Sequence, residues 1–145
     1  MSVSKAVVKL AQSDDDIARC HDVVRELRPH IVDAAALVAQ VRRQREQGYL
    51  LAYVEDEGRV VACAGFRVNE HLSWGKALYV DDLVTAEVER SKGYGELLLS
   101  WLTAQAKQEG CGELHLDSGT QRQAAHRFYF RERLTVTAFH FARKL

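Results

Sequence analysis

Hydrophobic residues recur along the chain with two periods, and these periods predict where the helices and strands lie. Apolar residues at helical spacing predict a first helix that begins after an N-cap at Ser13 and ends near Arg28. The single proline, Pro29, disfavours helical angles at the residue before it and so closes this helix. A second helix is expected from about Asp33, with Gly48 as its C-terminal stop.

Runs rich in β-branched and aromatic residues predict the strands of a sheet. The first run covers residues 6–11. Residues 49–55 and 59–68 are expected to pair as an antiparallel hairpin, because Asp56-Glu57-Gly58 between them is typical of a turn. The polar residues 69–75 then predict a connection to the third strand of the same sheet.

Residues 78–102 organise the rest of the prediction, because they read as a strand, a basic glycine turn and a helix. The turn contains Arg90, Lys92, Gly93 and Gly95. Glycines let the chain turn tightly, and the unpaired N–H groups of a first helical turn favour an anion. This stretch therefore predicts a phosphate-binding turn at the start of a long helix.

The last third of the chain predicts three more elements. Residues 113–117 form a short strand that should run parallel to the preceding one, because a helix joins the two. Residues 121–132 predict the last helix, and residues 136–143 predict a final strand with Phe139 and Phe141 on one side. The resulting fold class is α+β, with a mixed, mostly antiparallel sheet and helices on both faces.

Composition changes this picture little, but it excludes several function classes. The length predicts a single domain over residues 1–145. A formal net charge of +0 argues against a general binder of nucleic acid or membrane surfaces. Cys20, Cys63 and Cys111 are widely spaced in apolar segments and are expected to be buried free thiols. Without an apolar signal segment or a membrane-length apolar run, the chain is expected to be cytoplasmic, and a homodimer is the commonest default.

The glycine turn also resembles a family signature. Arg90-Ser91-Lys92-Gly93-Tyr94-Gly95 matches that of the GNAT superfamily of acetyl-CoA-dependent N-acetyltransferases, and it stands between a strand and a helix as the signature requires. Ala125-His126-Arg127-Phe128-Tyr129 is similar to the family's second cofactor-contacting element. The final third looks most like bacterial small-molecule acetyltransferases of the aminoalkylphosphonate type. It departs from the family at Arg133 and Leu134, where a glycine and an aromatic residue are usual, so the turn after the last helix is expected to differ.

The resemblance implies acetyl-CoA as cosubstrate, bound mainly through the backbone. The pantetheine arm resembles a peptide and is expected to pair with the strand at Leu83, Val84 and Thr85. The pyrophosphate is expected at the glycine turn, where the implied cofactor-binding residues are Arg90, Ser91, Lys92, Gly93, Tyr94, Gly95 and Glu96.

Acetyl transfer by direct attack of an amine needs a proton acceptor and an acid, and no cysteine nucleophile. Asp82 is the favoured acceptor and Asp81 the alternative, and a third interpretation makes both structural. Adjacent strand residues point to opposite faces, so only one aspartate should face the acceptor unless a bulge intervenes. The resemblance makes the Leu83 N–H an oxyanion donor and Tyr129 the acid, whereas composition alone would make Tyr129 a core aromatic.

The function predicted from these residues is acetyl transfer to the primary amine of a small molecule in a ternary complex. By the resemblance, the acceptor pocket involves the first two helices and their loop, around residues 27–31. A non-catalytic acyl-CoA-binding or sensing module is the alternative. A dinucleotide site is disfavoured because Leu98 replaces the third glycine of that motif. His115 and Asp117 lack a third ligand, so no metal site is predicted.

Overall fold

The computed structural model describes residues 5–145 and divides the chain into two compact units, residues 1–115 and 116–145. The single domain expected from the length stays a prediction. The first unit contains these elements: β1 (Val7–Leu10), α1 (Asp14–Arg19), α2 (His21–Leu27), α3 (Ala34–Arg45), β2 (Leu50–Asp56), β3 (Arg59–His71), β4 (Gly75–Thr85), a short 3-10 helix (Glu87–Glu89), α4 (Tyr94–Gln108) and β5 (Glu113–Leu116). The second unit, which begins with the last residue of β5, contains α5 (Gln123–Arg131).

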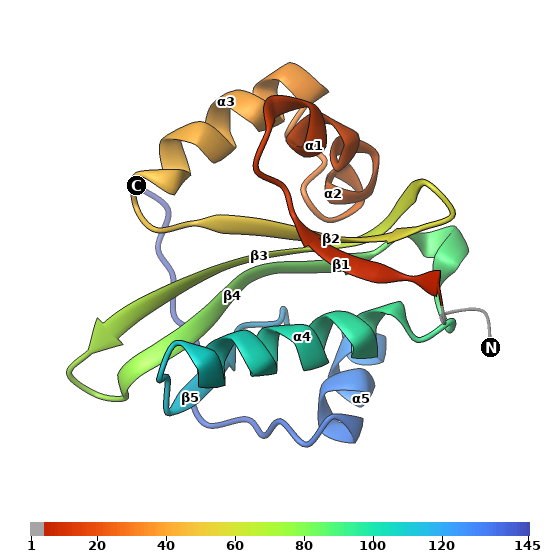
Figure 1. Ribbon diagram of the computed structural model, residues 1–145. Helices are drawn as coiled ribbons and strands as arrows, with labels where there is room; N and C mark the ends of the chain where they lie inside the picture. Colours follow the sequence, from red (N-terminus) through yellow and green to blue (C-terminus); the bar gives the residue numbers. More distant parts are fainter. Residues whose placement is uncertain (1–4) are drawn as a thin grey trace. The chain divides into compact units, whose positions relative to one another are not determined.

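The strands form one five-stranded sheet in the order β1-β2-β3-β4-β5 (Figure 1). The pairs β1–β2, β2–β3 and β3–β4 are antiparallel, and the sheet as a whole is mixed. Helices α1, α2 and α3 cover one face and α4 covers the other. The predicted α+β class, with a mostly antiparallel sheet and helices on both faces, is therefore confirmed.

The predicted caps of the N-terminal helices are present. Ser13 Oγ accepts a hydrogen bond from the Asp16 N–H at 3.1 Å, and Asp33 Oδ1 accepts one from the Ala36 N–H at 2.8 Å. The single helix predicted up to Arg28 is wrong, however, because the chain forms two short helices that meet at Cys20. There the backbone N–H bonds three residues back, to Ile17 at 3.0 Å, which tightens the last turn and redirects the chain.

The hairpin of β3 and β4 is longer than the sequence predicted. Residues 69–71 were expected to belong to a polar connection, but they extend β3 and pair with Ala77, Lys76 and Gly75. The ladder bonds backbone groups, so polar side chains at its exposed end do not stop it.

The predicted final strand over residues 136–143 is wrong. These residues form neither a strand nor a helix in the structure, and Phe139 and Phe141 are exposed. An alternating side-chain pattern makes a strand only where the backbone has a partner to pair with. The helix of the second unit, α5, lies close to the predicted one.

The core of the first unit lies between the sheet and its helices. Its largest fully buried side chains include Ile17, Tyr53, Leu78, Leu98 and Leu102. The expected burial of the free thiols is confirmed for Cys20 and Cys63, but Cys111 is only half-buried and corrects that expectation.

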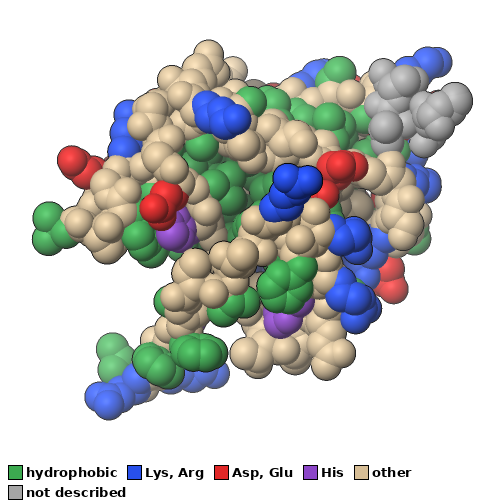
Figure 2. Space-filling view, turned by 90° about the horizontal axis from the view of Figure 1, so that it is seen from below, with side chains coloured by type: hydrophobic (Ala, Val, Ile, Leu, Met, Phe, Trp, Pro, Cys, Tyr) green, Lys and Arg blue, Asp and Glu red, His purple; other side chains and the backbone are tan. Residues whose placement is uncertain are grey.

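The surface carries side chains of both charges, which agrees with the formal net charge of +0. Acidic, basic and hydrophobic side chains are interspersed on the face that Figure 2 shows. Within residues 5–145, no helix combines the length and apolar character that crossing a membrane requires. The cytoplasmic location and the homodimer stay predictions.

Candidate active site

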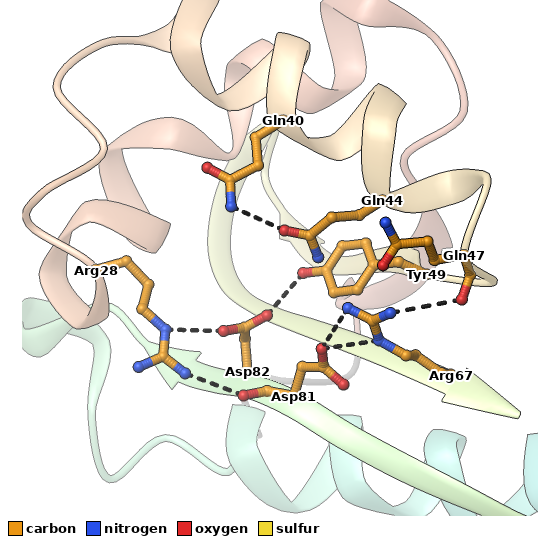
Figure 3. A network of polar contacts seen from close by, with 8 residues as sticks. All are labelled: Arg28, Gln40, Gln44, Gln47, Tyr49, Arg67, Asp81 and Asp82. Atoms are coloured by element: carbon orange, nitrogen blue, oxygen red, sulfur yellow. Dashed lines mark hydrogen bonds and ion pairs between the residues drawn. The ribbon is translucent and has the colours of Figure 1, made fainter. Parts of the chain in front are cut away.

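A bulge in β4 brings both predicted aspartates into one network. Gly65 of β3 pairs with Asp82, but the next residue, Phe66, pairs with Val80, so Asp81 is an extra residue on β4. The strict alternation of side chains is broken at this point. Asp81 and Asp82 both contribute to the polar network in Figure 3.

Asp82 is held by two donors from distant parts of the chain. Arg28, at the end of α2, donates from Nε to Asp82 Oδ1 at 2.8 Å and from Nη2 to the Asp81 carbonyl at 3.0 Å. Tyr49, just before β2, donates its hydroxyl to Asp82 Oδ2 at 2.8 Å. Each carboxylate oxygen therefore has a fixed partner and keeps a further lone pair for a ligand.

Tyr49 reaches Asp82 only because position 65 has no side chain. A Cβ on Gly65 would lie 1.8 Å from the Tyr49 hydroxyl oxygen. Burial, and then the charge of Asp82, raises the pKa of Tyr49 above its usual value. The phenol therefore stays protonated at neutral pH and acts as a hydrogen-bond donor.

Asp81 is bound to a different cation. Arg67 of β3 donates from Nε and Nη2 to Asp81 Oδ2 at 3.0 and 2.9 Å, and its guanidinium lies 5.5 Å from the ring centre of Tyr49. Burial raises the pKa of Asp81, while the Arg67 guanidinium opposes that shift. Asp81 thus has a fixed ion-pair partner within the sheet.

A cavity of about 310 Å³ lies beside this network, and Asp82, not Asp81, is among the residues lining it. The end of α2 and the loop after it contribute Leu27, Arg28 and Ile31, so the cavity occupies the region that the resemblance implied for the acceptor. His21 Nε2 lies 2.9 Å from the Ile31 carbonyl and ties this loop to α2. The remaining lining residues are Val24, His30, Leu37, Gln40, Val41, Gln44, Tyr49, Leu51, Cys63 and Val84.

The glycine turn directly precedes α4, as the sequence predicted, although Gly95 lies within the helix and not in the turn. Ser91 and Gly93 have positive φ angles of 68° and 89°, and α4 begins at Tyr94. No side chain caps α4, so the N–H groups of its first turn are not taken by a capping side chain. This end of α4 therefore fits a pyrophosphate.

The strand segment expected to bind pantetheine directly follows the bulge. Leu83, Val84 and Thr85 are the last residues of β4, and on the β3 side they pair with Ala64, Cys63 and Ala62. The Val84 side chain also lines the cavity. The strand edge and the cavity are thus built by consecutive residues of β4.

Tyr129 lies on α5, in the second unit. Its side chain is buried, and burial raises the pKa of its hydroxyl, whereas Arg122 opposes the shift. His126, one turn earlier, has its Nε2 2.8 Å from the Gly119 carbonyl. His126 is therefore engaged locally, and Tyr129 remains protonated at neutral pH.

Among residues 5–145, no group of three or more His, Cys, Asp and Glu side chains could hold a metal ion. His115 lies 2.7 Å from Glu113 Oε1 and stacks on Trp74 with ring centres 3.6 Å apart. His115 therefore has a partner both for its Nε2 and for its ring.

Sequence reasoning missed three of the residues that shape the site. The local pattern marked Arg28 only as the end of a helix, because 54 residues separate it from its partner Asp82. Tyr49 lies 33 residues before Asp82, and no local pattern links them. The one usable signal was a glycine within a buried strand, Gly65, which often marks a close approach of another group.

Comparisons with known proteins agree with this architecture. The model of the Acetyltransferase (GNAT) family matches residues 11–134. The chain is 31% identical over 122 residues to the uncharacterized N-acetyltransferase YhdJ of Bacillus subtilis, covering 84% of this chain and 86% of that protein. It is 30% identical over 89 residues to the aminoalkylphosphonate N-acetyltransferase of Salmonella typhimurium, covering 61% of this chain and 58% of that protein.

A solved structure extends the likeness to the fold. The aminoglycoside N-acetyltransferase AAC(6')-Iy, in complex with CoA, superposes with a TM-score of 0.81 at 12% identity, covering 96% of this chain and 94% of that one. At this identity the likeness concerns the fold alone. Because the family model covers most of the sequence, including the glycine turn and α5, the chain belongs to the GNAT family of acetyltransferases.

Proposed function

We propose that this protein transfers the acetyl group of acetyl-CoA to the primary amine of a small molecule, by direct attack in a ternary complex. The observation that carries the proposal is the position of Asp82. Its carboxylate lines a cavity of about 310 Å³ and directly precedes the Leu83–Thr85 edge expected to hold pantetheine. An amine in the cavity would thus meet a carboxylate next to the thioester.

The residues present fit acetyl-CoA, which when bound supplies the activated acetyl group. The turn from Arg90 to Glu96 would hold the pyrophosphate through N–H groups at the start of α4, where no side chain competes for them. The backbone of Leu83, Val84 and Thr85 would pair with the pantetheine arm. The Leu83 N–H would donate to the developing oxyanion.

Asp82 accepts the proton of the attacking amine, directly or through one water. Arg28 and Tyr49 fix the orientation of its carboxylate without occupying all of its lone pairs. Asp81 supports this arrangement from the neighbouring position through its pair with Arg67.

Tyr129 donates a proton from its hydroxyl to the departing thiolate. The raised pKa of this buried phenol keeps it protonated over the pH range in which an amine becomes neutral enough to attack. A phenol that ionised near neutral pH could not serve as an acid there.

The acceptor is a small amine, and aminoalkylphosphonates are the first class to test because one relative carries that name. Asp82 and the Arg28 guanidinium stand side by side at the cavity, so a compact molecule with an amine and an anionic group would find a partner for each. The apolar residues lining the same cavity suit a short hydrocarbon body between them.

Two measurements test the proposal. CoA and acetyl-CoA should raise the melting temperature, because a ligand that binds only the folded state stabilises it. Thiol release should then depend on an amine from a panel of aminophosphonates, amino acids, polyamines and simple amines.

For the active amine, initial rates at several fixed acetyl-CoA concentrations should give intersecting double-reciprocal lines, as a ternary complex requires. Parallel lines would contradict direct attack. A melting shift without turnover on any amine would instead favour the acyl-CoA-binding or sensing module.

A further inference from the structure

We propose that two buried carboxylates, Glu89 and Asp56, are positioning residues that hold the glycine turn in its pyrophosphate-binding conformation. The inference rests on the proposed use of acetyl-CoA. It adds two residues, and a role for the β2–β3 hairpin, that neither the signature nor the comparisons assign.

Burial singles these two residues out. Among the described residues, Asp56 and Glu89 are the acidic side chains that are buried, each 5% exposed. Acidic residues are rarely buried unless they are paired, because removing a charge from water is costly. Both pair with residues of the glycine turn or next to it.

Glu89 joins the turn to the hairpin. It ends the 3-10 helix after β4, and its Oε1 accepts a hydrogen bond from Lys92 Nζ at 2.8 Å. Its Oε2 accepts one from Arg59, the first residue of β3. The hydrogen bond from Lys92 lowers the pKa of Glu89 most, and the one from Arg59 lowers it further, so the carboxylate stays charged at neutral pH.

Asp56 holds the other side of the turn. Tyr94 follows Gly93 directly and begins α4, and its hydroxyl donates to Asp56 Oδ2 at the end of β2. The two anchors therefore bind Lys92 and Tyr94, the residues on either side of Gly93.

The backbone between the anchors needs support. Ser91 has a φ of 68°, which is uncommon and unfavourable for a residue other than glycine, and Gly93 has a φ of 89°. Such angles persist where the surroundings enforce them. Anchors at Lys92 and Tyr94 do so, and they fix the direction of the N–H groups that open α4.

A purely stabilising role is a weaker explanation. Glu89 is buried, but its partners Arg59 and Lys92 are 54% and 44% exposed, and ion pairs with solvent-exposed partners contribute little to stability. The Glu89 cluster also carries one acid and two bases, which leaves one positive charge beside a turn that must attract a diphosphate. Lys92 thus acts mainly by binding the turn to Glu89, and its charge contributes to the net positive charge of this cluster.

The test compares ligands with and without the pyrophosphate. Glu89→Gln should weaken CoA binding about tenfold or more in calorimetric titrations, because a charged hydrogen-bonded anchor is lost. Binding of pantetheine, which has the same arm but lacks both the pyrophosphate and the 3′-phosphoadenosine, should be unchanged in an NMR titration. Glu89→Asp should recover part of the CoA affinity, and Tyr94→Phe, which removes the second anchor alone, should also weaken CoA selectively.

The matched control is Glu87→Gln, on the same 3-10 helix but exposed, which should bind CoA like the wild type. Unchanged CoA affinity in both Glu89→Gln and Tyr94→Phe would overturn the positioning role, as would an equal loss of CoA and pantetheine. If Glu89→Gln does not fold, Tyr94→Phe decides alone. A wild-type protein that binds pantetheine but gains nothing from the pyrophosphate overturns the positioning role, whereas one that binds neither ligand overturns acetyl-CoA use as well.

Discussion

The two ends of the first unit that we propose for the cofactor and for the acceptor are built in different ways. The cofactor end is one continuous stretch, the edge at Leu83–Thr85 and the turn up to Glu96, and it offers mainly backbone groups. The acceptor end gathers side chains from distant positions, with Arg28 and Tyr49 meeting at Asp82. A ligand shared by a whole family can be held by backbone geometry, whereas an acceptor that differs between members requires side chains.

The two ends should therefore respond differently to mutation. Side-chain changes at the acceptor end should alter the handling of the amine. At the cofactor end, changes should matter where they disturb the backbone or the anchors at Glu89 and Asp56.

The largest effect is expected for Asp82→Asn. The amide cannot accept the amine proton, so kcat/KM for the amine should fall by about a hundredfold or more, with little change in the Kd for CoA. Steady-state kinetics and calorimetry measure the two quantities.

Asp81→Asn is the matched control, one residue away and bound to Arg67 instead of lining the cavity. Its effect on kcat/KM should be at least tenfold smaller. Equal losses in the two variants would remove the distinction between the aspartates.

Tyr129→Phe should lower kcat by roughly ten- to a hundredfold while the Kd for CoA stays close to that of the wild type. The hydroxyl is lost but the ring remains, so packing of α5 is preserved. Because burial raises the pKa of Tyr129, the wild-type rate should not fall from loss of this acid until the pH rises above the ordinary range of tyrosine ionisation. An unchanged kcat would exclude Tyr129 as the acid.

Gly65→Ala should damage the acceptor end through Tyr49. The added methyl group would overlap the Tyr49 hydroxyl, so we expect a loss of about 1–3 kcal/mol in the free energy of unfolding and a severalfold higher KM for the amine. Denaturant unfolding and kinetics check both.

Gly112→Ala is the control, since Gly112 has no neighbour within 4 Å of the added carbon and no positive φ. If Gly65→Ala is as stable and active as this control, the close approach of Tyr49 to position 65 is not required for the site.

The smallest effect concerns the Tyr94–Asp56 anchor at alkaline pH. The hydrogen bond to Asp56, followed by burial, raises the pKa of Tyr94 to about 12. A folded pKa above the unfolded value means that the anchor's contribution is complete below about pH 10 and is lost as the pH rises through about 12. Ultraviolet absorbance should show one tyrosine ionising near pH 12 that is missing in Tyr94→Phe, and no such difference would place Tyr94 outside the anchor.

Sequence reasoning predicted the five strands of the sheet and the order of strand, turn and helix around Gly93, because each depends on local periodicity or on a short motif. It failed for the strand over residues 136–143, where the pattern of Phe139 and Phe141 could not reveal whether the backbone had a partner. It also could not predict the bulge at Asp81, which depends on register with β3.

The acceptor end shows the same limit more clearly. Asp82 became a candidate because it directly precedes Leu83–Thr85. Its partners Arg28 and Tyr49 come close to it only through the three-dimensional packing of α2 and β2. A tyrosine next to a glycine stop and an arginine before a proline have ordinary local explanations, so neither points to the site.

The division between the two ends is tested most directly by measuring the Kd for CoA and the KM for the amine in the same two variants, Asp82→Asn and Glu89→Gln. We expect Asp82→Asn to change the kinetics of the amine and leave CoA binding intact, and Glu89→Gln to weaken CoA and leave the KM for the amine at saturating acetyl-CoA intact. If either variant changes both quantities to the same degree, the two ends are not separate sites.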